Sequence, residues 1–393
     1  MKSPVARCAS PDSSLPRRRA WLVALAASAC SLHAAAQSAP APAGGRSDIL
    51  IGRTTALSGG MAPFLAPIHL GQDAAIADLN AQGGIGGRKV RFVTLDDGFE
   101  APRAIANARM LGDKDGVLAL FGVAGTSQVL GMLPYLAEAK LPLISVYTGS
   151  PAVRTQASPY LFTTRASYAD ELVKIVRNLV AVQTARIGVA YESNDFGKLL
   201  LPLVEKVIAA EGATLAGSAS LEPSGKGADE ATRKLSEVKP QAVLLIAAGP
   251  PVVAFVRANR AQLGVPVYTL SLGAGAAVLQ ALGEDARGLA VARTGPSPTK
   301  PTLQLTRDFQ ASMKRHGRTA DYDHFTGYMD ARVLIEGLRA AGPGVTRASL
   351  VQAMQGLGTL DLGGYTYQFG PQNRHGSSYV DIAVVGSGGV YRQ

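Results

Sequence analysis

Short apolar runs alternate with amphipathic segments along most of the chain. The first series predicts strands at 49–54, 90–95, 117–121 and 143–146. Between them, helices are predicted over 68–79, from Pro102 onward, and over 129–139. A second series predicts strands at 186–191, 215–221, 242–247, 265–270 and 288–294, with helices at 172–179, 196–211, 228–238 and 252–263. Two successive series of strand–helix units predict an α/β protein with two parallel sheets, each covered by helices on both faces.

The last hundred residues do not continue this alternation. Helices are predicted at 303–314, 325–341 and 348–355, followed by short alternating strands between Tyr365 and Tyr391. We therefore expect the late helices to complete the first domain and the late strands to complete the second. The predicted N-terminal lobe comprises 48–164 plus 296–362, and the C-terminal lobe comprises 165–295 plus 363–393. The chain then crosses between two Rossmann-like lobes about three times, a hinge geometry suited to closing over a ligand.

The first 36 residues have the three parts of a secretory signal peptide. Arg17, Arg18 and Arg19 precede an apolar run over 20–27, and small residues follow up to Ala36. The apolar run is shorter than the ~20 residues that a membrane span needs. We predict cleavage after Ala36, a flexible tether at 37–47, and a periplasmic location. Two alternatives stay open: a twin-arginine signal at Arg18 and Arg19, or a lipid anchor at Cys30.

Composition and charge exclude several classes of protein. The chain is 47% hydrophobic and 17% charged, which excludes a disordered protein. The net charge of +10 is spread thinly, without a basic stripe and interleaved aromatic residues, so no nucleic-acid partner is expected. The two cysteines, Cys8 and Cys30, both lie in the leader, so the exported chain is expected to lack disulfides. The five His residues are scattered, and no metal or other cofactor is predicted.

Glycine-rich segments do not have the order that nucleotide binding requires. The run at 83–87 follows a helix and precedes a strand, the reverse of a dinucleotide fingerprint. Gly273 and Gly275 follow a strand but lack the third glycine and the acidic ribose partner. No Walker sequence and no Gly-x-Ser-x-Gly elbow is present. We therefore expect a protein without enzymatic activity, and an exported Rossmann-type oxidoreductase is the weaker alternative.

Polar loops follow several predicted strands, where ligands of open α/β sheets bind. Thr126 and Ser127 open a helix, so their hydroxyl groups and the free N–H groups suit a carboxylate. Plain helix capping by the same residues is equally consistent with the pattern. The next loop, Tyr147 to Gly149, is a second candidate, or simply a polar turn. Asp195 and Phe196 could present an acid and a ring across the cleft, or form a helix cap with a hydrophobic staple.

Several motifs together resemble the branched-chain-amino-acid type of substrate-binding proteins of ABC importers, the leucine-binding-protein-like group. The resemblance runs from about Asp48 to the C-terminus. The motifs are Ile51-Gly52, Leu57-Ser58-Gly59, Asn80 to Val90, Asp96-Asp97, Gly122 to Thr126, Tyr147-Thr148-Gly149, Arg165 to Glu171 and Asn194 to Gly197.

The resemblance implies a type I periplasmic binding fold, with two lobes, three hinge crossovers and the ligand between the lobes. It implies that the loops at Thr126 and at Tyr147 to Gly149 hold a ligand carboxylate, while Phe196 covers the ligand on closure. The predicted ligand-binding residues are Ser58, Thr126, Ser127, Tyr147, Thr148, Gly149, Tyr168, Asp195 and Phe196.

The chain departs from this family at the positions that hold the ligand ammonium. By a rough alignment, the acid of leucine-type members falls at Leu272 and an aromatic partner near Ala248 or Gly249. The usual disulfide of the first lobe is absent. A carboxylate with an apolar or aromatic tail, or an amide-like solute, therefore fits at least as well as an amino acid.

The resulting prediction is a monomeric periplasmic receptor that delivers a small organic solute to an ABC permease in the inner membrane. The same fold also serves ligand sensors that dock to a membrane signalling partner, and that alternative stays open.

Overall fold

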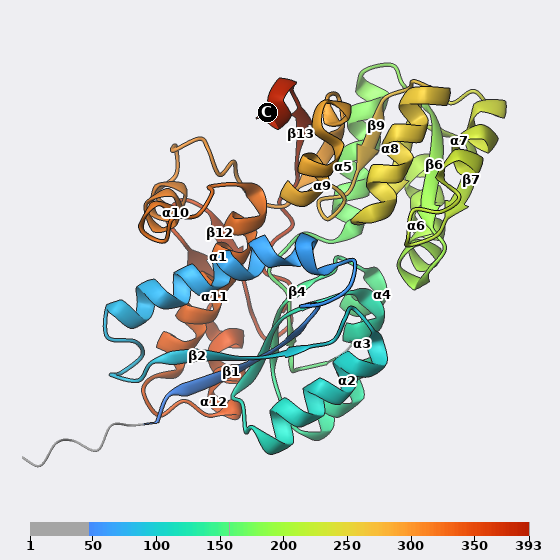
Figure 1. Ribbon diagram of the computed structural model, residues 1–393. Helices are drawn as coiled ribbons and strands as arrows, with labels where there is room; N and C mark the ends of the chain where they lie inside the picture. The colour runs from blue at the N-terminus through green and yellow to red at the C-terminus, as the bar shows by residue number, and fades with distance from the viewer. Residues whose placement is uncertain (1–46, 157, 393) are drawn as a thin grey trace, which may run out of the picture. The chain divides into compact units, whose positions relative to one another are not determined.

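Two sheets with their covering helices make up the part of the chain that the computed structural model describes, residues 47–156 and 158–392 (Figure 1). The predicted leader, its cleavage after Ala36, both cysteines and most of the tether lie outside the described residues. Among the described residues, no helix has both the length and the apolar character that a membrane crossing requires.

The first sheet is parallel throughout, as predicted. Its strands lie in the order β2 (Val90–Asp96), β1 (Ile49–Thr55), β3 (Ala119–Ala124), β4 (Leu143–Tyr147) and β5 (Leu161–Phe162). Every residue of β3 and β4 is buried, because helices cover both faces of the sheet. The short β5 and the helix α4 (Pro151–Arg154) were not predicted, since two to four residues are too few to show a period.

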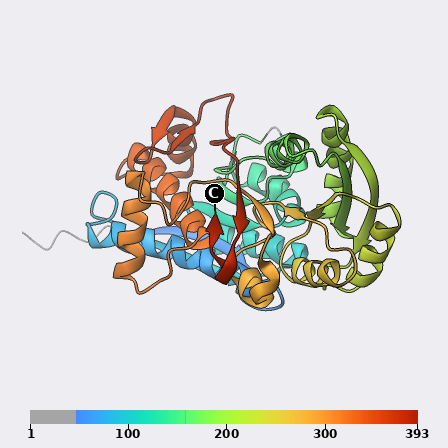
Figure 2. The same cartoon turned by 90° about the horizontal axis from the view of Figure 1, so that it is seen from above.

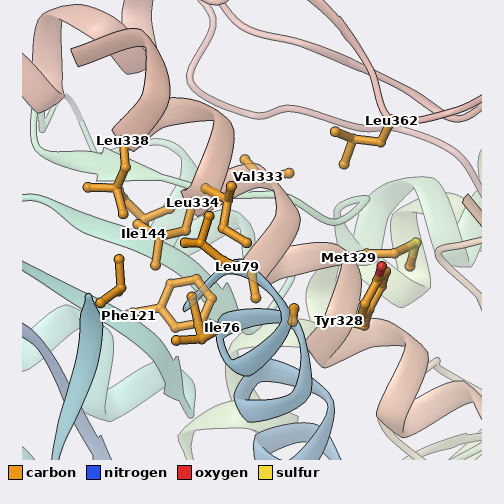
Figure 3. Packing of buried hydrophobic residues seen from close by; sticks show 14 of the residues in the cluster. Ile76, Leu79, Phe121, Ile144, Tyr328, Met329, Val333, Leu334, Leu338 and Leu362 are labelled. Carbon is orange, nitrogen blue, oxygen red and sulfur yellow. The ribbon is translucent and has the colours of Figure 1, made fainter. Parts of the chain in front are cut away.

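Side chains of β3 pack on both faces of the first sheet, and Gly122, with φ +70°, interrupts their alternation. Leu120 and Val123 pack against helices α2 (Ala101–Arg109) and α3 (Thr126–Glu138). Ala119 and Phe121 pack on the other face, against three further helices. These are α1 (Ala62–Ala81), α10 (Gln304–Arg315) and α11 (Tyr322–Ala341), with α12 (Arg347–Gly356) at the edge. The late helices thus complete the first core, as predicted, and Figure 3 shows Leu334 and Leu338 of α11 beside Ile144.

Helices α1 and α11 pack unusually closely. A Cβ atom at Gly71 would collide with the carbonyl oxygen of His324, and one at Gly327 would collide with that of Ile68. Glycine at both positions therefore lets the two backbones touch, which holds the middle of α1 beside the first two turns of α11.

The second sheet has the order β14, β13, β10, β9, β8, β6, β7. Its parallel strands are β6 (Arg186–Glu192), β7 (Thr214–Leu221), β8 (Ala242–Ile246), β9 (Val267–Thr269) and β10 (Ala290–Arg293). Strands β13 (Asp381–Val385) and β14 (Tyr391–Arg392) join it antiparallel (red in Figure 2). Its helices are α5 (Tyr168–Ala181), α6 (Asp195–Ala210), α7 (Ala228–Glu237), α8 (Pro250–Gln262) and α9 (Ala276–Leu282). Helix α5 begins with a capping box between Ser167 and Asp170.

The chain passes between the two sheets after β5, after β10 and before β13. The third passage does not start at residue 363, where the predicted C-terminal lobe resumes. The hairpin β11 (Thr359–Asp361) and β12 (Thr366–Gln368) contributes Tyr365 and Tyr367 to the core of the first sheet. The late strands were expected to complete the second domain; β13 and β14 do so, but β12 pairs with β11 and packs on the first core. We propose that the first lobe extends to about Ser377, whose hydroxyl pairs with that of Tyr365 at 2.8 Å.

Candidate functional site

A cavity of about 720 Å³ lies where the carboxyl ends of strands from both sheets meet. First-sheet residues reach it just beyond β1, β2, β3 and β4, and second-sheet residues just beyond β6, β7, β8, β9 and β10. The first turn of α11 and the segment after β10 also line it. The cavity therefore occupies the position at which open parallel sheets bind ligands, with walls from both lobes.

Thr126 is the first residue of α3 and does not cap the helix. Gly125 occupies the N-cap position with φ +97°, and no side chain bonds the helix start. The hydroxyl of Thr126 instead lies 2.9 Å from that of Thr148, at the end of the neighbouring strand, and both residues are buried. The capping interpretation of Thr126 is therefore wrong. The first N–H groups of α3 have no partner within the helix and, with Thr126 and Thr148, line the cavity.

Ser127 and Asp195 come from opposite lobes and bond to each other. The hydroxyl of Ser127 donates to Oδ2 of Asp195 at 2.9 Å, at an exposed edge of the cavity. One interpretation of the sequence held that Asp195 caps α6, and that interpretation is wrong. Asn194 is the N-cap and accepts a hydrogen bond from the Gly197 N–H at 3.2 Å.

Two predicted aromatic residues form one wall of the cavity. The rings of Tyr168 and Phe196 meet edge to face, with centroids 5.5 Å apart. Tyr147 also lines the cavity, and its hydroxyl accepts a hydrogen bond from the Gln72 amide at 2.9 Å. Burial raises the pKa of Tyr168 to about 12, so its hydroxyl stays protonated at neutral pH.

Ser58 and Gly149, two of the predicted ligand-binding residues, lie outside the cavity lining. The Ser58 hydroxyl donates to Asp96 at 2.6 Å, and this bond together with the N–H groups of Gly98 and Leu57 holds the pKa of Asp96 well below its usual value. The Gly149 carbonyl accepts from the Tyr168 N–H at 2.8 Å. Both residues thus hold loops next to the cavity. Spacing along the chain does not distinguish a residue that holds such a loop from one that lines the cavity.

Charged residues line the cavity at positions that the sequence interpretation passed over. Arg165 is 6% exposed and donates to Ser271 at 2.5 Å, while its Nε and Nη1 atoms have no partner. The guanidinium of Arg293 lies against the rings of both Tyr322 and Tyr391, at 4.2 and 4.1 Å from their centroids. Both arginines lie close to a passage of the chain between the sheets. That position is the feature of the sequence that could have identified them as cavity residues.

Glu192 is a buried carboxylate in the cavity wall. Its Oε1 accepts from the Ala248 N–H at 2.7 Å and its Oε2 from the Asn194 amide at 2.6 Å. Burial nevertheless raises the pKa of Glu192 above its ordinary value. Within the described part of the chain, no group of His, Cys, Asp or Glu residues has the arrangement of a metal site.

The first turns of α1 supply apolar lining that was also missed. Met61, Phe64, Leu65 and Ile68 line the cavity and follow the end of β1, so the strand-end rule points to them. Met61 and Phe64 also approach Gly249 of the second lobe, where a Cβ atom would lie 3.0 Å from the Met61 sulfur. With the Ser127–Asp195 bond, this contact shows the two lobes touching around the cavity.

Comparisons with known proteins agree with this architecture. The model of the periplasmic binding protein family matches residues 48–389. A solved structure of a substrate-binding periplasmic protein from Ralstonia solanacearum is similar, with 31% identity and a TM-score of 0.81, covering 88% of this chain and 99% of that one. A Leu/Ile/Val-binding protein homolog from Brucella abortus is 24% identical over 84% of this chain and 86% of its own length. An amino acid binding protein from Pseudomonas aeruginosa is 26% identical over 154 residues, and the match spans only 41% of that protein.

Proposed function

Because the chain belongs to the periplasmic binding protein family, we propose that it is a receptor that binds a small organic carboxylate between its lobes and delivers it to an ABC importer. The observation that carries this proposal is the cavity walled by both lobes, with the uncapped start of α3 at one end. The hydroxyls of Thr126 and Thr148 and the first N–H groups of α3 are suited to the oxygens of a carboxylate.

Arg165 provides a second argument for an anionic ligand, separate from the one based on the start of α3. Its side chain lies in the cavity wall with two nitrogen atoms, Nε and Nη1, that have no hydrogen-bond partner, and among the described residues no carboxylate lies within 4 Å of it. A positive charge beside the cavity lowers the energy of a bound carboxylate relative to a neutral solute. No group in the proposed site needs to form or break a covalent bond, so the proposed role is binding alone.

Ligand binding is proposed to act through lobe closure. The Ser127–Asp195 bond and the contact of Met61 with Gly249 exist only while the lobes are together, so a ligand that touches both lobes favours that state. Export of the receptor is proposed to follow removal of the leader after Ala36, which N-terminal sequencing of the periplasmic protein would check against a lipidated Cys30.

The direct test combines a ligand screen with solution scattering. Carboxylates, amino acids and amides are screened by thermal shift, because a ligand that binds the folded state raises the melting temperature with its concentration. The best carboxylate should then reduce the radius of gyration. If no carboxylate stabilises the protein while amides do, the carboxylate assignment is wrong; if a saturating ligand leaves the scattering unchanged, the closure model is wrong.

A further inference from the structure

A second polar region of the cavity wall lies where the end of β10 meets the starts of α9 and α11. It is lined by Gly275, Arg293 and Asp323. Nη2 of Arg293 donates to the Ala274 carbonyl at 2.9 Å. Oδ2 of Asp323 accepts from the Ala276 N–H at 2.6 Å. A guanidinium and a carboxylate therefore flank the same short stretch of wall, with Gly275 between the two backbone groups that they bond.

The two charged side chains come from different lobes. Arg293 ends β10 of the second sheet, whereas Asp323 lies in the first turn of α11, which packs on the first sheet. A Cβ atom at Gly275 would collide with the Asp323 carboxylate, so glycine lets the two lobes approach here. A ligand group that bonds both side chains would bridge the lobes and favour the closed state.

Both side chains keep hydrogen-bonding capacity that the protein leaves unused. Nε of Arg293 is buried without a partner, and the guanidinium is held in place by the tyrosine rings beside it. Asp323 is partly exposed, and its bond to Ala276 uses Oδ2, which leaves Oδ1 as an acceptor. A buried donor without a partner is costly, so a ligand oxygen that accepts from Arg293 would be favoured.

Arg53 shows how a buried arginine with a structural role differs from Arg293. Nε of Arg53 donates to Thr94 at 3.2 Å, and its Nη1 pairs with Asp73 at 3.0 Å. Around Arg293, by contrast, no carboxylate of the described residues lies within 4 Å of a guanidinium nitrogen. Arg293 and Asp323 thus flank the wall without closing on each other as an ion pair.

Opposite charges in one stretch of wall disfavour a charged ligand group. A carboxylate would be attracted by Arg293 and repelled by Asp323, and an ammonium would meet the reverse, so neither recovers the hydration that it loses. A neutral group that both accepts and donates can bond each side chain, and hydrogen bonds to charged partners are the stronger kind. A carboxamide has this pattern, with its oxygen for the guanidinium and its N–H groups for the carboxylate.

We propose, resting on the receptor function proposed above, that the carboxylate ligand carries a second, neutral hydrogen-bonding group of the carboxamide kind. This group binds between Arg293 and Asp323, while the carboxylate binds at the start of α3. Phe325 and Met329 line the cavity beside the first turns of α11 and suit the hydrocarbon that joins the two groups.

Matched ligands that differ only at the end far from the carboxylate test the proposal. Calorimetry compares adipamate with adipate, 6-aminohexanoate and 6-methylheptanoate, and repeats the set at other chain lengths. The measurements are made at pH 8, because burial raises the pKa of Asp323 and the ionised carboxylate is the form proposed to act. At the best chain length the carboxamide should bind roughly tenfold more tightly than each of the others.

The possible failures of this comparison are distinct. Equal or tighter binding of the dicarboxylate, the ω-amino acid or the branched monocarboxylate at every chain length would overturn the inference and leave the receptor function standing. Failure of all these acids, and of every other carboxylate in the screen, would overturn the carboxylate function itself.

The variant Asp323→Asn tests the residue assigned. It leaves the positive charge of Arg293 without its counterpart, so adipate should gain on adipamate by roughly tenfold or more. Asp321→Asn is the matched control: Asp321 caps α11 outside the cavity lining, and asparagine caps equally well, so the ratio should change little. An unchanged ratio in Asp323→Asn, with a melting curve that shows a folded protein, would mean that Asp323 only holds the start of α9 and would overturn the inference.

Arg293→Gln provides a second test that does not depend on the folding of Asp323→Asn. It leaves the negative charge of Asp323 alone at this stretch of wall, so 6-aminohexanoate should gain on adipate by roughly tenfold or more. An unchanged ratio in this variant, when it is folded, would equally overturn the inference.

Discussion

Helices α3 and α6 begin in the same way but use their first turns differently. Each follows a buried parallel strand, and each opens with polar residues at the cavity. At α6, Asn194 caps the helix and is itself held by Glu192. At α3, Gly125 holds the N-cap position without a side-chain cap, and the Thr126 hydroxyl pairs with Thr148. The start of α6 is satisfied within the protein, whereas the start of α3 has donors left for a ligand.

This difference assigns separate tasks to the two lobes. The first lobe offers hydrogen-bond donors, because a helix start without a cap leaves N–H groups open. At its strand ends the second lobe offers self-contained loops and apolar side chains such as Leu272 and Phe196, and its unpartnered donors belong to Arg165 and Arg293 and not to a helix start. Substitutions in the two helix starts should therefore have opposite effects on affinity and stability, as the following predictions specify.

The largest expected effect is on ligand affinity in Thr126→Ala. A hydrogen bond to a charged group is worth about 1.5–3 kcal/mol, so affinity for the best carboxylate should fall roughly ten- to a hundredfold. The free energy of unfolding should fall by only about 1 kcal/mol, because the Thr148 hydroxyl keeps the Ser150 N–H as a partner at 3.2 Å. Calorimetry and urea unfolding measure the two quantities.

Thr126→Ser is the control for this variant, since it keeps the hydroxyl and removes only a methyl group. Its affinity should stay within a few-fold of the wild type. Equal affinities for wild type and Thr126→Ala would show that the hydroxyl does not contact the ligand, and the contrast between α3 and α6 would then lose its functional meaning.

Asn194→Ala should show the opposite pattern at α6. Loss of an N-cap costs about 0.5–2 kcal/mol of folding free energy, while the ligand affinity should change less than roughly twofold. Asn194→Ser retains a capping oxygen and should recover most of the lost stability. Urea unfolding of both variants, beside calorimetry, checks this. A strong loss of affinity without loss of stability would mean that α6 also binds the ligand directly.

The fold could be predicted because its signals are local. Strand runs such as 242–247 and the capping box at Ser167 are visible in a few residues, and both are present in the structure. The site was harder because its parts come from many strand ends. Thr126, Thr148 and Phe196 were predicted to bind a ligand; they line the cavity, and ligand binding by them stays a prediction. Arg165 and Phe64 were not among the predicted ligand-binding residues, because only the folded chain brings them to the cavity. Ser58 was included through the motif Leu57-Ser58-Gly59 of the resemblance, and its hydroxyl bonds Asp96 outside the cavity lining.

The bond between Ser127 and Asp195 should contribute a smaller share of affinity. It joins the lobes in the closed state and is exposed, so Ser127→Ala should weaken binding of every ligand by roughly two- to tenfold. The preference between ligands should not change, because the bond acts on closure and not on the ligand. Ser224→Ala is the matched control: Ser224 also lines the cavity, but its hydroxyl bonds Glu222 on its own loop. A changed preference in Ser127→Ala would place Ser127 in contact with the ligand.

The smallest expected effect is a change in the pH dependence of stability, and it tests how the start of α6 is held. Burial raises the pKa of Glu192, so the folded state binds its proton more tightly than the unfolded chain does. The resulting stabilisation is complete below about pH 4.3, the ordinary value for glutamate, and is lost as the pH rises through the raised pKa. Glu192→Gln cannot titrate, so the wild type should lose unfolding free energy relative to this variant between pH 4 and pH 7.

Urea unfolding at several pH values measures the difference, with Glu205→Gln on the exposed side of α6 as a control that should follow the wild type. A difference that does not change with pH would show that burial does not raise the pKa of Glu192. The same series on Thr126→Ala should run parallel to the wild type, because the start of α3 is held by hydroxyl groups that do not titrate in this range.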